Sequence, residues 1–273
     1  MVEWPNPVDS WFADHLDLLF DHGEEKPDRT GTGTLSLFGK VARFNLIEQT
    51  FPLLTLKHTN FNAIKAELLW FLRGETNTNT LDSSIWDDWA DENGDVGPVY
   101  GKQWRSWQGT DGAVFDQIQD LCENLKTNPH SRRHIVSAWS VGELDQMGLM
   151  PCHYAMQLHV SQNTFLDIMV HQRSADLMLG VPFNFASYAL LQQMIAQVCN
   201  LVPGRYYHTF GDLHIYNNHL DAASYILTNR ESTQAKTKVE LNPDIKDIDG
   251  FGPDDIRLVG YEAHPKIPLP IAV

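Results

Sequence analysis

Residues 182–199 read PFNFASYALLQQMIAQVC, and this stretch decides the fold class. Apolar and small side chains recur on every face of the helix that it predicts, and Pro182 suits a first helical turn. Such a helix has to be buried on most sides. We expect strands to pack around it, at 154–160 and 165–171 before it in the chain and at 206–210 after it.

Further elements interleave irregularly with this core. Asn60 can cap and Gly74 can end a strongly amphipathic helix at 61–73. Other patterns predict helices at 10–20, 116–126 and 218–227, a strand at 134–137, and a hairpin of 34–38 and 41–44 about Gly39-Lys40. Such a mixture favours an α+β fold with a mixed sheet. No linker or repeat divides the chain, so we predict a single domain over 1–273.

The composition limits the partners. The chain carries a net charge of −15, whereas nucleic acids and anionic membranes bind an exposed basic surface, so we expect neither as a stable partner. The start of the chain, MVEWP, lacks the basic and apolar parts of a secretory signal, and no apolar stretch approaches about 18 residues. Three cysteines without a CxxC pair suit a reducing compartment, so we expect a cytoplasmic protein. An anionic ligand would need a local group of arginines.

Three patterns that suggest a ligand site have simpler interpretations. The run GTG at 31–33 lacks the third glycine of a dinucleotide loop, and we interpret it as a turn. The acidic run at 87–95 departs from a calcium loop at both ends and fits a solvated loop. His208, His214 and His219 lack the i, i+4 spacing of a helical metal site, so we expect no metal.

Two positions admit both a structural and a catalytic interpretation. Glu67 leaves its predicted helix beside the apolar face, where a buried carboxyl with a raised pKa suits proton transfer. A half-exposed glutamate at the edge of that face fits equally well. Cys152 precedes a predicted strand. It is either a small buried side chain or, beside an arginine or a histidine, a nucleophile.

Two groups of arginines are candidates for an anion site. Arg173 and Ser174 end a predicted strand and combine a guanidinium with a hydroxyl, which are groups that bind phosphate. Arg132 and Arg133 enter the predicted strand at 134–137. Strand alternation would send their side chains to opposite faces, so two adjacent arginines need not bind the same phosphate. The alternative is that both are solvent-exposed surface residues.

Short motifs stand in a fixed order along nearly the whole chain. They read DRTGTG at 28–33, WDDWADENGDVGPVYG at 86–101, MPCH at 150–153, QRSAD at 172–176, LGVPFNFASYA at 179–189, GDLHIY at 211–216 and PIAV at 270–273. In sequence and order they resemble thymidylate synthase, whose scaffold the pyrimidine hydroxymethylases share. The resemblance implies a mixed sheet covered by helices and a homodimer formed through sheet packing.

The resemblance also implies a reaction, the reductive methylation of dUMP to dTMP with 5,10-methylenetetrahydrofolate as cosubstrate and dihydrofolate as coproduct. Cys152 would attack C6 of uracil, and Arg173 would hold the phosphate and keep the thiolate charged. Asn184 would pair with N3 and O4, where an aspartate would suit cytosine. The implied catalytic residues are Cys152, Glu67, Tyr100, His153, Arg173 and Asn184.

Two binding sets follow from the same resemblance. The dUMP site would comprise Arg29, Arg132, Arg133, Arg173, Ser174, Ala175, Asp176, Asn184, His214 and Tyr216, with Arg132 and Arg133 donated by the partner subunit. The folate site would comprise Lys57, Asn60, Ile85, Trp86, Asp176, Leu179, Gly180, Phe183 and Ala272. Trp86 and the tail at 272–273 would cover the reacting centre.

The chain departs from the family pattern mainly on the folate side. His58, Asn60 and Ala66 replace common family residues there, and His171 replaces the usual tyrosine before the QRSAD motif. A dUMP hydroxymethylase, which uses water in place of hydride, is therefore an alternative. A non-catalytic nucleotide- or RNA-binding relative is another. Trp86 and the tail favour the synthase, because both should exclude water during hydride delivery.

Overall fold

The computed structural model describes residues 6–47 and 50–272. These residues form six α-helices and ten β-strands. The helices are α1 Pro7–His22, α2 Phe61–Leu72, α3 Tyr100–Ser106, α4 Gln117–Thr127, α5 Gly180–Val198 and α6 Leu220–Asn229. The strands are β1 Glu24–Lys26, β2 Thr34–Asn45, β3 Trp107–Gln108, β4 Val114–Phe115, β5 Ile135–Ser137, β6 His153–Ser161, β7 Phe165–Asp176, β8 Val202–Tyr216, β9 Lys238–Leu241 and β10 Ile256–Val259.

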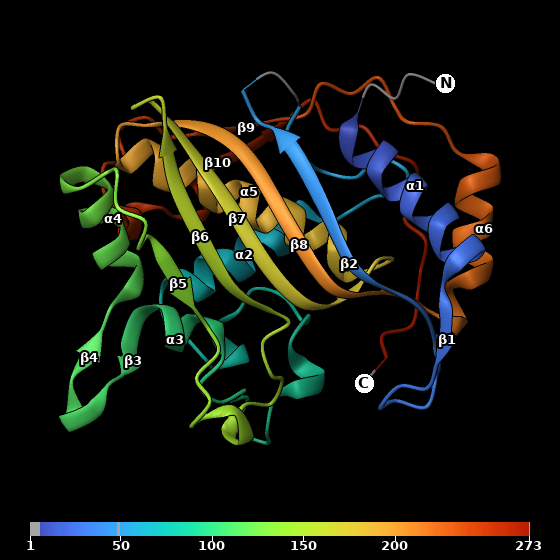
Figure 1. The fold of residues 1–273 in the computed structure, drawn as a ribbon, viewed down its shortest axis with the longest axis horizontal. Coiled ribbons are helices and arrows are strands. Elements are labelled where there is room, and N and C mark those ends of the chain that lie inside the picture. Colours follow the sequence, from blue (N-terminus) through green and yellow to red (C-terminus); the bar gives the residue numbers. More distant parts are fainter. Residues whose placement is uncertain (1–5, 48–49, 273) are drawn as a thin grey trace.

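Helix α5 forms the centre of the core, as its sequence predicts. It runs behind the main sheet in Figure 1, and from 185 to 196 every residue apart from Gln193 is buried. Gln192 is fully buried, and its side-chain amide donates to the carbonyls of Leu166 (2.7 Å) and Arg205 (3.2 Å). Since these carbonyls belong to β7 and β8, the amide ties the helix to both strands.

The main sheet has the strand order β1-β2-β8-β7-β6-β5. β7 and β8 run parallel and the other neighbouring strands run antiparallel, so the predicted mixed sheet and α+β class are confirmed. A parallel pair needs a long crossover connection, and α5 supplies it. In this register Gln172 pairs with Phe210 and Asp176 with His214. Two of the sequence motifs therefore lie side by side at the ends of β7 and β8.

The predicted hairpin about Gly39 is wrong. Residues 34–38 and 40–45 belong to one strand, β2, and both parts pair with β8. Gly39 interrupts the ladder with φ +75°, a conformation that glycine adopts without strain. A glycine that resembles a turn thus marks an irregularity in a long strand. β8 is correspondingly longer than the predicted strand at 206–210, because it pairs with the whole of β2.

The other predicted elements are present, with shifted ends. The Asn60 side chain caps α2 by accepting from the amide of Ala63 at 3.3 Å, and Gly74 follows the helix with φ +73°. Helix α3 was not predicted. Arg132 and Arg133 lie in the turn before β5 and not in the strand itself. None of the described helices has the length and hydropathy needed to cross a bilayer.

One face of the sheet is left uncovered by the described chain. Alternate residues of β7, such as Val170, are buried toward α5, and their neighbours point the other way. That second face, which we call the open face, carries the half-exposed side chains of Tyr154, Met169, His171, Tyr207 and Thr209, with Val41 and Arg43 beside them. In Figure 1 the central strands lie in front of α5 and α2. Apolar, aromatic and polar side chains are thus mixed on the open face.

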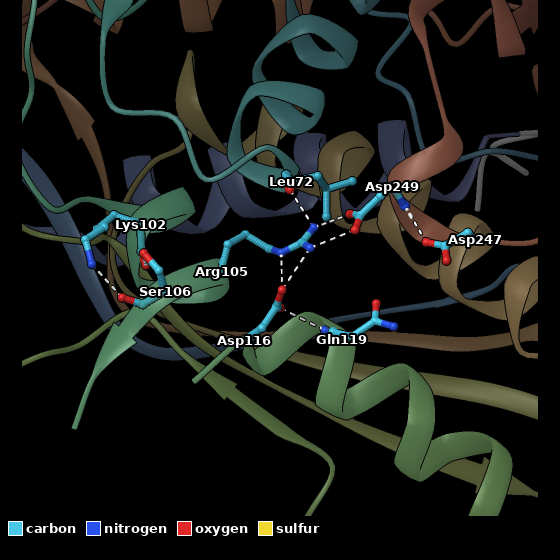
Figure 2. A network of polar contacts seen from close by, with 8 residues as sticks. All are labelled: Leu72, Lys102, Arg105, Ser106, Asp116, Gln119, Asp247 and Asp249. Carbon is cyan, nitrogen blue, oxygen red and sulfur yellow. Dashed lines mark hydrogen bonds and ion pairs between the residues drawn. The ribbon is translucent and has the colours of Figure 1, made fainter. Parts of the chain in front are cut away.

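The side chain of Arg105 connects three segments that lie far apart in the sequence (Figure 2). Its guanidinium donates to the carbonyl of Leu72 (2.6 Å), to Asp116 (3.0 Å) and to Asp249 (2.9 Å from Nη2). The side chain of Arg105 is 14% exposed. These contacts connect the end of α2, the start of α4 and the segment after β9.

We predict that Arg105→Met lowers the free energy of unfolding by about 1–3 kcal/mol, because it leaves a buried carbonyl and two carboxylates without their donor. Arg257→Met is the matched control. Arg257 pairs with Glu240 but is 73% exposed, so its loss should cost below about 1 kcal/mol. Urea denaturation measures both changes, and an equal or larger effect at Arg257 would contradict the role of Arg105.

Candidate active site

Cys152 lies immediately before β6, where main-chain contacts fix its position. Its amide donates to the hydroxyl of Tyr100 at 2.8 Å, and its carbonyl accepts from the amide of Arg173 at 2.8 Å. Burial raises the pKa of the Cys152 thiol, while the charge of Arg173 acts in the opposite direction. The charge of Arg173 favours the thiolate, but burial outweighs this effect.

Arg173 is held by main-chain carbonyls and remains exposed. Its Nε donates to Pro151 and its Nη2 to Met150, both at 2.9 Å, and the guanidinium lies 5.5 Å from the ring centre of Trp139. Neutral partners of this kind leave its positive charge uncompensated. The group is therefore available to an anion beside Cys152.

Glu67 faces an aromatic wall. Trp86 donates its indole N–H to the Glu67 carboxylate at 2.8 Å, and the Trp86 side chain is 5% exposed. Burial raises the pKa of Glu67 to about 7, and the hydrogen bond from Trp86 opposes that rise. The residue as a whole is half-buried, as in the structural interpretation, while its carboxyl is desolvated and hydrogen-bonded, as the catalytic interpretation requires.

Tyr100 and His153 lie between Glu67 and Cys152. Their rings stack at 4.3 Å, and His153 Nδ1 shares a hydrogen bond with the Tyr188 hydroxyl at 2.8 Å. Burial lowers the pKa of His153 to about 3 and raises that of Tyr100 well above its usual value. Both rings are neutral at physiological pH. The Tyr100 oxygen accepts from Cys152, so its own hydrogen is free to donate to a ligand.

Most of the residues predicted for dUMP within this chain lie at the ends of β7 and β8, whereas Asn184 lies in α5 and Arg29 in the turn before β2. His214 contacts Asp212 through Nδ1 at 3.0 Å and lies 5.1 Å from the ring of Tyr216. Burial raises the pKa of Tyr216 to about 12, with the charges of Asp176, Asp28 and Cys152 adding to the rise and that of Arg29 opposing it. Ser174 and Ala175 are neighbouring residues of β7.

Arg132 and Arg133 are not brought to this group. Both are exposed in the turn before β5, and neither guanidinium forms a hydrogen bond or ion pair with the described residues. The GTG run at 31–33 is a turn, in which Asp28 accepts from the amides of Thr30 (2.8 Å) and Gly33 (2.7 Å). The described part of the chain holds no cluster of three metal-ligating side chains.

The predicted folate side combines a buried lysine with a carboxylate. Burial lowers the pKa of Lys57 to about 8, while Asp176 stabilises its charge. Asp176 accepts from the amide of Met178 at 2.9 Å, and it lies 3.9 Å from Nδ1 of His219. Nε2 of His219 donates to the carbonyl of Pro270 at 2.8 Å. The C-terminal segment is thus linked to the pterin side of the predicted site.

The other folate candidates fall into two groups. Leu179, Gly180 and Phe183 lie at the start of α5, where a side chain at Gly180 would sit 3.7 Å from Asn184 Oδ1. Ile85 packs against the core beside Trp86, and the Asn60 side chain caps α2. Ala272 is partly buried. Val273 lies outside the described residues.

Several residues of the site were not predicted. Gln172 donates to Asn184 Oδ1 at 3.1 Å and accepts from His208, which itself contacts Tyr206. Tyr188 and His219 were missed as well. The sequence contains one signal for this network, because Gln172 and His208 occupy inward positions of otherwise apolar strands. A polar side chain there needs partners.

A cysteine thiol, a carboxyl with a raised pKa and an arginine without a negative partner suit covalent catalysis on an anionic substrate. Comparison with known families narrows this class. The model of the family described as thymidylate synthase matches residues 10–273, and the chain belongs to that family. The family is one of methyltransferase-type enzymes of nucleotide biosynthesis that use methylenetetrahydrofolate as cosubstrate.

We predict that Cys152 is alkylated by iodoacetamide at a rate that increases with pH and does not level off at pH 8, because the pKa of the thiol is raised and only the thiolate reacts. Arg173→Gln removes the charge that lowers this pKa, so alkylation at pH 8 should become slower. Arg43→Gln on the open face is a control for the change in net charge, and Cys152→Ser identifies the labelled thiol. Unchanged or faster alkylation of Arg173→Gln would contradict the electrostatic effect.

Proposed function

We propose that the protein is a thymidylate synthase, which methylates dUMP to dTMP and produces dihydrofolate. The exposed guanidinium of Arg173, with Arg29 and Ser174, would bind the 5′-phosphate. Asn184 would contact N3 and O4 of uracil, and His214 and Tyr216 the sugar hydroxyl. Lys57 would offer its ammonium to an anionic folate, and Asp176 would accept from the N–H groups of a pterin.

Cys152 would form the covalent bond. Its sulfur adds to C6 of uracil, and the electron pair moves to C5, which becomes a nucleophile. Methylenetetrahydrofolate supplies both the one-carbon unit and the hydride. Expulsion of Cys152 then restores the double bond between C5 and C6.

Proton transfers at O4 and C5 would fall to Glu67 and its neutral neighbours. A carboxyl with a pKa of about 7 can give up and recover a proton at little cost near neutral pH. Tyr100 keeps its phenolic hydrogen, and His153 stays uncharged, so both can donate or relay without an added charge in the pocket.

The aromatic side chains around Glu67 are the observation that supports thymidylate synthase over the hydroxymethylase. The Trp86 ring lies about 6 Å from those of Trp70, Phe71, Trp89 and Tyr100, measured between centroids, and its N–H is used by Glu67. We infer that a wall of this kind would limit the access of water to the reacting carbon. Hydride is then the favoured reactant, and the hydroxymethylase reaction is disfavoured.

We predict that dUMP and methylenetetrahydrofolate yield dTMP and dihydrofolate in equal amounts, measured by chromatography and by dihydrofolate absorbance. Cys152→Ser should abolish turnover and retain dUMP binding. Trp86→Phe should increase the share of 5-hydroxymethyl-dUMP more than its neighbour change Trp89→Phe, because it removes the indole N–H that Glu67 uses. If the unaltered protein makes 5-hydroxymethyl-dUMP without dihydrofolate, it is a hydroxymethylase. Full activity of Cys152→Ser would exclude both reactions.

We further propose a homodimer formed through the open face of the sheet. His171 bonds to Thr209 at 3.0 Å and Arg43 lies 5.6 Å from the ring of Tyr207, so this face is ordered and partly apolar. Arg132 and Arg133, which have no partner within the described chain, would then complete the phosphate site of the other subunit. Two further positive charges there would suit the dianionic phosphate.

Mixing two inactive chains tests the shared site. A dimer of Arg133→Gln with Cys152→Ser contains one complete site if Arg133 acts across the interface. Random exchange in an equal mixture should then restore roughly a quarter of the normal activity. Each variant mixed with itself is the control. A lack of rescue in dimers shown by mass spectrometry to have exchanged would refute the role of Arg133 in the partner's site.

A further inference from the structure

A chain of hydrogen bonds crosses the buried inner side of β7 and β8. The Tyr206 hydroxyl lies 2.8 Å from Nδ1 of His208, and Nε2 of His208 lies 2.8 Å from Oε1 of Gln172. Nε2 of Gln172 contacts both the Ser174 carbonyl (2.9 Å) and Asn184 Oδ1 (3.1 Å). Tyr206 and His208 are fully buried and Gln172 is 4% exposed. Neither Tyr206 nor His208 has a place in the chemistry described above.

One main-chain carbonyl fixes the direction of every bond in this chain. The Ser174 carbonyl can only accept, so Gln172 has to present its NH2 group there. Its oxygen then faces His208 Nε2, which has to carry a hydrogen. The other hydrogen of the Gln172 amide faces Asn184, which therefore presents its oxygen. The Asn184 NH2 group is left pointing elsewhere.

Packing keeps the histidine in one state. The ring of His208 stacks on that of Phe210 at 4.5 Å, and the Phe185 ring is 5.4 Å away. Burial lowers the pKa of His208 well below its usual value, so the ring is neutral. A neutral ring with a hydrogen on Nε2 has an acceptor at Nδ1, and the Tyr206 hydroxyl donates to it.

We propose that Tyr206, His208 and Gln172 are positioning residues that lock the amide of Asn184 in one orientation and thereby select uracil over cytosine. The proposal rests on the proposed function, in which Asn184 contacts the pyrimidine edge. Uracil offers a donor at N3 and an acceptor at O4, and cytosine offers the reverse at N3 and N4. An asparagine that is free to turn over could match either base.

Exchanging the oxygen and NH2 positions of the Asn184 amide would cost hydrogen bonds. Reversing Asn184 would bring its NH2 group against the NH2 group of Gln172, and Gln172 cannot reverse without losing both Ser174 and His208. A buried site that leaves such groups unpaired rejects the ligand that requires it. Discrimination against dCMP would therefore depend on residues that never touch the nucleotide.

The decisive comparison is between His208→Phe and His208→Gln. Phenylalanine keeps the stack on Phe210 but removes the donor to Gln172, whereas the glutamine side chain can keep an N–H near the position of Nε2. We expect His208→Phe to lower the ratio of kcat/KM for dUMP to that for dCMP by about tenfold, the effect of one lost buried hydrogen bond, and His208→Gln to retain most of it. Asn184→Asp is the positive control for lost selectivity.

Binding measurements separate positioning from a general structural effect. Deoxyribose 5-phosphate occupies the phosphate and sugar groups without a base, so its affinity should be the same in His208→Phe and in the unaltered protein. If His208→Phe does not fold, two other measurements test the proposal. They are the selectivity of Tyr206→Phe and the ¹⁵N NMR spectrum of His208 in the unaltered protein. The spectrum should show a neutral ring with its hydrogen on Nε2, and Tyr206→Phe should reduce the selectivity ratio.

The outcomes distinguish the two proposals. An unaltered protein without preference for dUMP would refute the proposed function. A protein that prefers dUMP, and whose preference survives in His208→Phe, would refute the positioning role alone. So would a His208 spectrum with the hydrogen on Nδ1. A parallel loss of deoxyribose 5-phosphate affinity would show a structural role instead.

Discussion

The parallel pairing of β7 and β8 is the constraint on which the rest of the molecule depends. Because parallel neighbours need a connection across a sheet face, α5 has to lie on the inner side of the sheet. Its nearly continuous apolar surface then requires cover on the opposite side, which α2 provides. The same packing brings Asn184 and Tyr188 to the strand ends that carry Gln172 and Arg173. The core and the site are therefore products of one arrangement.

Burial, more than ion pairing, sets the protonation of this site. It raises the pKa values of Cys152 and Glu67 and lowers that of His153, so each group is pushed toward its neutral form. Arg173 keeps its charge among neutral carbonyls. The pocket of an acidic protein with a net charge of −15 thus offers a local positive group to an anion. Substrate capture in such a pocket depends on contact with a few guanidiniums and little on long-range attraction.

The sequence predicted what local patterns determine. Helix α2, with its cap at Asn60, and helix α5 follow from periodicity and end signals, and the motifs that resemble the family supplied the candidate residues of the site. The hairpin prediction at Gly39 was wrong because a local pattern cannot show whether two strand segments pair with each other or with a third strand. The contact of Gln172 with His208 could not be predicted from the sequence for a similar reason. It depends on the register of β7 against β8, which only the assembled sheet defines.

The pairing of β2 with β8 has a consequence for how the protein is made. Thr34 pairs with Tyr216 and Asn45 with Arg205, so β2 leaves the ribosome well before its partner β8. During synthesis the edge of β2 that β8 covers has to stay unpaired until β8 has emerged, while β1 can pair only with the start of β2. The sheet can close only late, and its assembly is the step at which the nascent chain is most open to association with other chains.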